Sequence, residues 1–106
     1  MKVSKLIDFF KGWVVVNFEP SLFKTDDFEV AVKSYKKGDY EPKHYHKVAT
    51  EITIITKGRV VMNFEVYNEG DIIVMEPGEA TDFRATNDVT TTVIKFPCVE
   101  GDKYLV

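Results

Sequence analysis

The spacing of apolar residues changes after the first dozen positions of the chain. Before that point apolar side chains recur at helical intervals from Leu6 to Phe10. Ser4 precedes them as a candidate N-cap, and Gly12 follows them as a candidate terminator. The pattern predicts a short N-terminal helix, which would form an arm over residues 1–12.

Beyond this arm the chain consists of short apolar segments separated by turn residues. In segment 27–35, Phe28, Val30 and Val32 would occupy one face of a strand, with Glu29 and Lys33 on the other. Eight or nine such segments with no long helix between them predict an all-β fold, a small antiparallel β-barrel over residues 13–97 followed by a tail over 98–106. The expected strands are 13–18, 27–35, 44–47, 50–56, 59–64, 66–67, 72–75, 80–85 and 89–96.

The composition excludes several classes of protein. A chain of 106 residues fits a single domain, and its 14 basic and 17 acidic residues give a formal net charge of −3. The lysines are scattered, so a nucleic-acid partner is not expected. No stretch approaches the ~20 apolar residues that span a membrane. The N-terminus lacks a secretory signal and Cys98 is the only cysteine, which favours a reducing, cytoplasmic location.

Both histidines of the chain lie in one short segment, His44-Tyr45-His46. Residues at positions i and i+2 of a strand point to the same side, so the two imidazoles can chelate one cation. Glu51 follows as an isolated acid in an apolar strand, where a carboxylate is costly unless it is paired or binds a metal. Two histidines and one carboxylate suit Fe(II), with Zn, Mn or Ni as alternatives.

The spacing around these residues resembles the first sequence motif of the cupin superfamily. Gly38 is followed after five residues by His44, after one more by His46, after four by Glu51 and after six by Gly58. The resemblance implies a cupin, a double-stranded β-helix of jelly-roll type, with a divalent metal centre at His44, His46 and Glu51.

The second cupin motif is only partly present. Gly70-Asp71 and Pro77-Gly78 match it, but Thr81 stands where the family places a third histidine. The resemblance therefore implies a three-ligand centre with an open position beside Thr81. Thr81, Thr53, Phe83 and Met62 are the candidate ligand-binding residues, with core packing as the alternative role for Phe83 and Met62.

Three functions remain open from the sequence. The first is a metal-dependent enzyme acting on a small polar molecule, and the second is a non-catalytic binder of a sugar or carboxylate with a degenerate metal site. The third is a structural module that forms a homodimer, with the strand predicted at 13–18 as one possible interface. No residue can be assigned a catalytic role, because both histidines belong to the candidate metal site.

Overall fold

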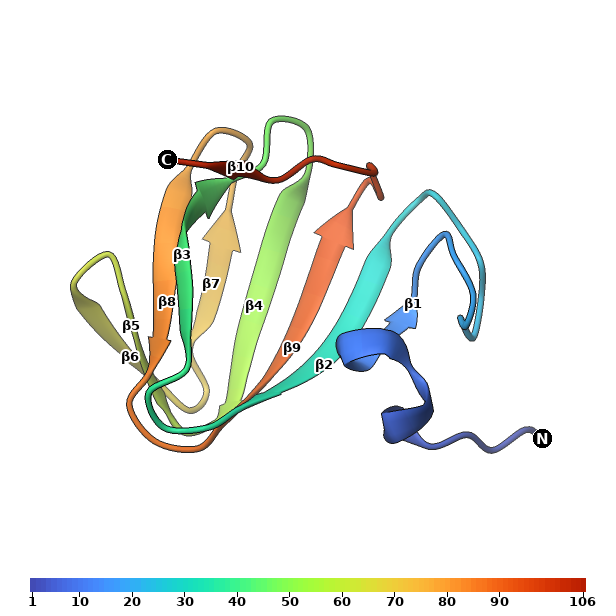
Figure 1. The fold of residues 1–106 in the computed structure, drawn as a ribbon, viewed down its shortest axis with the longest axis horizontal. Helices are drawn as coiled ribbons and strands as arrows, with labels where there is room; N and C mark the ends of the chain where they lie inside the picture. The colour runs from blue at the N-terminus through green and yellow to red at the C-terminus, as the bar shows by residue number, and fades with distance from the viewer.

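The computed structural model describes all 106 residues as two facing five-stranded antiparallel sheets (Figure 1). One sheet has the order β1-β2-β9-β4-β7 and the other β10-β3-β8-β5-β6. Between β2 and β9 every connection except β5–β6 crosses from one sheet to the other, as in a jelly roll. The strands are β1 Trp13–Val15, β2 Glu29–Tyr35, β3 Tyr40–Tyr45, β4 Thr50–Lys57, β5 Arg59–Met62, β6 Glu65–Asn68, β7 Ile72–Met75, β8 Ala80–Ala85, β9 Val89–Phe96 and β10 Tyr104–Leu105.

The all-β jelly-roll expectation is confirmed, but the two sheets are not joined by strand pairing into a closed barrel. The clearest shift of a boundary is in β3, which begins at Tyr40 rather than at residue 44. This strand continues through Pro42, where its register with β8 is irregular between Glu41 and His44. Proline is tolerated at such irregular positions because the strand there does not need its missing N–H group.

The N-terminal arm forms two 3₁₀ turns, η1 at Leu6–Asp8 and η2 at Phe10–Gly12, in place of the single expected helix. Lys11 has a φ of +50°, a left-handed conformation that ends helical propagation, and Ser4 does not cap the first turn. Gly12 has a φ of +79°, and a Cβ atom there would overlap the Val32 carbonyl oxygen. Glycine therefore lets the arm lie against β2. No helix of the structure is long and apolar enough to cross a membrane.

The space between the sheets has an apolar end and a polar end. The apolar end is a packed cluster of Ile55, Val60, Met62, Phe83, Ala85 and Val89. At the polar end Glu29 of β2, Lys95 of β9 and Glu51 of β4 are neighbours in register across the sheet. Alternation in β2 thus turns Glu29 and Lys33 toward the other sheet and leaves Val30 and Val32 on the outside.

Candidate metal and ligand site

The two histidines lie next to each other at the end of β3. Their ring centroids are 5.5 Å apart and the ring planes are nearly perpendicular. Strand β10 pairs with β3 at this point, so that Leu105 lies beside His44. The C-terminal tail therefore covers the strand edge next to the histidines (Figure 1).

Each histidine presents a nitrogen able to bind a cation. Nδ1 of His44 lies 2.9 Å from the carbonyl oxygen of Pro42. A carbonyl can only accept, so Nδ1 carries the proton and Nε2 keeps its lone pair, an arrangement typical of metal-binding histidines. Burial, assisted by the charge of Lys95, lowers the pKa of His46 to about 4, so this ring is uncharged at neutral pH.

Glu51 lies on the inner face of β4, with Lys95 on one side and Met75 on the other. Burial raises the pKa of its carboxyl group, an effect that Lys95 and Lys33 oppose. Neither of the two ion pairs in the structure includes Glu51. As the side chains stand, no three His, Cys, Asp or Glu residues are grouped closely enough to hold one metal ion.

Further charged residues lie near these three, and only a weak pattern in the sequence indicated them. Lys95 pairs with Glu29 at 3.4 Å, and the thiol of Cys98 donates to the other oxygen of Glu29 at 3.0 Å. The ammonium groups of Lys95 and Lys33 both lie over the ring of Trp13, 5.6 and 5.1 Å from its centroid. Only the alternation of polar residues in segment 27–35 could have indicated that Glu29 and Lys33 share a face.

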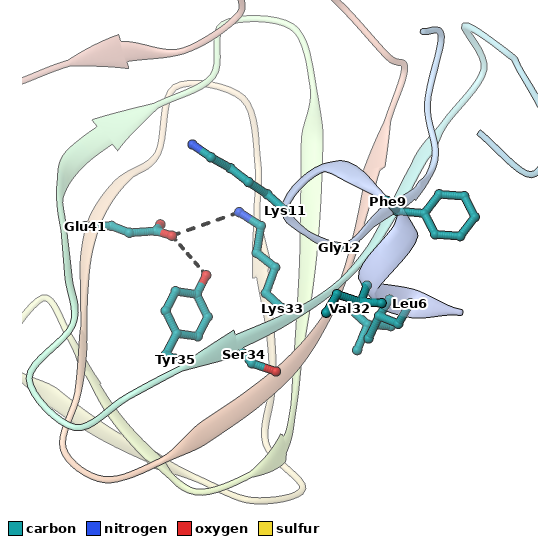
Figure 2. Close-up of a pocket in the computed structure, with 10 residues that line it drawn as sticks. Leu6, Phe9, Lys11, Gly12, Val32, Lys33, Ser34, Tyr35 and Glu41 are labelled. Atoms are coloured by element: carbon teal, nitrogen blue, oxygen red, sulfur yellow. Dashed lines mark hydrogen bonds and ion pairs between the residues drawn. The ribbon is translucent and has the colours of Figure 1, made fainter. Parts of the chain in front are cut away.

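A second polar group comes from β2 and β3. The Tyr35 hydroxyl donates to Oε1 of Glu41 at 2.9 Å, and Nζ of Lys33 lies 4.0 Å from the same oxygen (Figure 2). Burial, followed by the charge of Glu41, raises the pKa of Tyr35. Tyr35 therefore acts here as a neutral hydrogen-bond donor.

Asp102 anchors the loop that leads from His46 to Glu51. This carboxylate is only 4 % exposed and accepts hydrogen bonds from the backbone N–H groups of Lys47, Val48 and Ala49, at 2.8, 3.1 and 2.9 Å. Burial by itself would raise the pKa of Asp102, but the backbone hydrogen bonds outweigh burial and lower it. Sequence reasoning missed this residue because its partners lie more than fifty positions away.

The four candidate ligand-binding residues all face the interior. Thr81 is paired with His44 across β8 and β3, and its hydroxyl donates to the carbonyl oxygen of Asp82 at 2.7 Å. Thr53 is buried on β4, two positions beyond Glu51. Phe83 and Met62 belong to the apolar cluster, and none of the four lines one of the three cavities of 310 to 710 Å³.

Comparison with known proteins identifies the fold. No family model and no curated protein sequence matches the chain. Among solved structures, a Klebsiella pneumoniae protein with a double-stranded β-helix domain has a TM-score of 0.70 at 20 % identity, covering 80 % of this chain and 75 % of that one. The DMSP lyase DddQ of Ruegeria pomeroyi has a TM-score of 0.72 at 22 % identity, covering 89 % of this chain but 49 % of its own, so this chain spans about half of that lyase.

A third similar structure is named as a cupin. It is a sugar phosphate isomerase of the cupin superfamily from Silicibacter pomeroyi, with a TM-score of 0.61 at 20 % identity, covering 66 % of this chain and 50 % of that chain. The similarity agrees with the jelly-roll strand order described above. The chain therefore has the cupin fold, a double-stranded β-helix made of two facing antiparallel sheets.

Proposed function

We propose that this cupin binds a small polar molecule, such as a sugar or a carboxylate, beside a divalent cation held by His44, His46 and Glu51. The proposal is carried by the pair of histidines at the end of β3. His44 keeps Nε2 free because its Nδ1 is hydrogen-bonded to the carbonyl oxygen of Pro42. His46 is buried and uncharged. Two neighbouring imidazoles with an available ring nitrogen each can bind one cation.

The chemistry of the three donors fits a cation such as Fe(II), Zn, Mn or Ni. Glu51 is a partly buried acid without an ion pair, and a bound cation would compensate the cost of its burial. The three side chains are not grouped as they stand, so binding one ion would require them to approach one another. A cation held there would act as a Lewis acid toward a substrate oxygen. Thr81 lies next to His44 in register and stands where the cupin motif has a third histidine.

Titration calorimetry with Zn, Mn and Ni salts tests the metal site on protein purified without an affinity tag. The wild-type chain is expected to bind one ion, and the His44→Ala/His46→Ala double variant is expected to bind none. Tyr45→Phe is the matched control, because Tyr45 lies between the histidines but stacks on Tyr104 instead. Equal binding by the double variant and the wild type would refute the site.

A non-catalytic binder without a metal is the second candidate. It is favoured by the absence of any group of three donor residues and by the hydroxyl of Thr81, which is already bound to Asp82. The similar structures include a lyase and an isomerase by name, which favours the enzyme, but a shared fold does not fix a function. Turnover of a candidate substrate separates the enzyme from the binder.

We also propose a homodimer, and one sheet face supports it. The outer face of β9, β4 and β7 carries a continuous patch without any charge. Sheet faces exposed to water normally alternate with polar residues, and an uncharged face can pack against its own copy without like-charge repulsion. This self-association patch is formed by Ile52, Ile54, Ile72, Val74, Thr92 and Ile94.

We also propose a cytoplasmic location, which is consistent with the single free thiol of the chain.

A further inference from the structure

The largest of the three cavities, about 710 Å³, is a groove between the N-terminal arm and the edge of β2. Strand β1 pairs with β2 only at Val30 and Ala31, so the rest of this edge lacks a neighbouring strand. The arm lies beside this edge (Figure 1), and its residues line one side of the groove. The volume falls within the ~300–1,000 Å³ typical of small-molecule sites.

One end of this arm groove is polar. In Figure 2 the side chains of Lys11 and Lys33 extend toward Glu41, and the hydroxyl of Tyr35 points to the same carboxylate. The Tyr35 hydroxyl donates to Oε1 of Glu41 at 2.9 Å, and Lys33 approaches that oxygen only to 4.0 Å. A distance of 4.0 Å is too long for a hydrogen bond, so the Lys33 ammonium keeps its donors available.

The polar end carries more positive than negative charge, although its two ammonium groups also lie near the aromatic rings of Phe10 and Trp13. It contains two ammonium groups and one carboxylate, and Lys11 takes part in neither of the two ion pairs. The Glu41 carboxylate is already bound by Tyr35. An anion is therefore the complementary ligand, because it can accept hydrogen bonds from both ammonium groups.

The other end of the arm groove is apolar. Leu6 and Ile7 remain 45 % and 89 % exposed, which is unusual for aliphatic residues lining a cavity. An aliphatic chain lying along the groove would remove this surface from water. The apolar wall is formed by Leu6, Ile7, Phe9 and Val32.

We propose that the arm groove binds a small amphipathic carboxylate. Its carboxylate group is held by Lys11 and Lys33, and its short aliphatic chain packs on the apolar wall. The groove shares no residue with the set His44, His46 and Glu51, although the charge of Lys33 also acts on the carboxyl group of Glu51.

Hexanoate is a suitable probe, followed by amide chemical shifts in ¹⁵N-labelled protein. Acetate has the same head group without the chain, and hexylamine has the same chain with the opposite charge. Hexanoate is expected to shift the amide signals of Lys11, Gly12 and Val32 to Tyr35 and to bind about tenfold or more tightly than acetate. Hexylamine is expected to bind more weakly than hexanoate by a similar factor. Equal affinity for hexanoate and hexylamine, or shifts confined to other residues, would overturn the proposal.

Variants distinguish this site from the metal site. Lys11→Met and Lys33→Met keep the aliphatic part of each side chain and should each weaken hexanoate binding about tenfold. Lys11 lies on the exposed arm, so its variant keeps the test valid even if Lys33→Met disturbs the sheet. Leu6→Ser should weaken hexanoate but not acetate. The His44→Ala/His46→Ala variant should bind hexanoate normally, and loss of binding there, or no loss in both lysine variants, contradicts the assignment.

Discussion

Replacing Asp102 by asparagine tests whether the C-terminal tail holds the loop between His46 and Glu51. The carboxylate accepts hydrogen bonds from three consecutive backbone N–H groups and is 4 % exposed, so water cannot replace it. Asparagine has the same shape but presents only one accepting oxygen. The side-chain NH₂ group of the asparagine would then face a backbone N–H group, and two donors cannot form a hydrogen bond with each other.

The magnitude follows from the number of bonds lost. Hydrogen bonds to a charged group contribute about 1.5–3 kcal/mol each, and a buried donor left without a partner adds a penalty of ~1–3 kcal/mol. Asparagine retains part of the network, so we expect Asp102→Asn to lower the free energy of unfolding by about 3 kcal/mol. Asp71→Asn is the control, because Asp71 accepts from one backbone N–H group, of Asn68, in an exposed turn. Asp71→Asn should lower the free energy of unfolding by only about 1 kcal/mol.

The pH dependence has a definite sign. The folded-state pKa of Asp102 is lowered, so its contribution to stability is present above the unfolded pKa of about 3.9 and is lost as the pH falls through the folded value. The difference between wild type and Asp102→Asn should therefore be constant near pH 7 and shrink below pH 4. Urea unfolding of both proteins at pH 7 and below pH 4 measures this difference in stability. At pH 7 the midpoint of Asp102→Asn should lie about 1–3 M below that of the wild type. Equal midpoints for Asp102→Asn and Asp71→Asn would refute this account of the loop.

Two other predictions concern the outer surface and the buried thiol. Ile72→Lys places a charge in the self-association patch and should convert a dimer into a monomer in light scattering, whereas Val66→Lys on the opposite sheet should not. A wild type that is already monomeric contradicts the proposed interface. Burial and the hydrogen bond to Glu29 raise the pKa of Cys98 to about 11, so iodoacetamide at pH 8 should modify the folded chain at least ~100-fold more slowly than the chain in urea. Similar rates in both states would show that the thiol is accessible and easily ionised.

Much of the fold follows from local patterns. Alternation of apolar residues and the turn residues between segments predicted strands β1 to β9, because side chains in a strand point alternately to opposite faces, whereas β10 lies in the expected tail. The same rule predicted that His44 and His46 share a side, and their rings lie 5.5 Å apart. The arm was less predictable, because the left-handed Lys11 and the close approach of Gly12 to Val32 depend on contact with β2.

The sequence by itself determined the all-β class and the segment that carries both histidines, since these depend on periodicity and spacing, and its resemblance to the first cupin motif implied the jelly-roll type. The tertiary structure decided which face of each strand is internal. In β2 it turned Glu29 and Lys33 inward, where Glu29 pairs with Lys95 of the neighbouring strand β9 and Lys33 pairs with Glu41 of the facing sheet. Only the folded chain brings Asp102 to the loop after His46 and separates Glu51 from a closed group of donors. Such contacts join residues that are distant in sequence. Charge pairs between them produce no repeating pattern along the chain, so they cannot be predicted from periodicity.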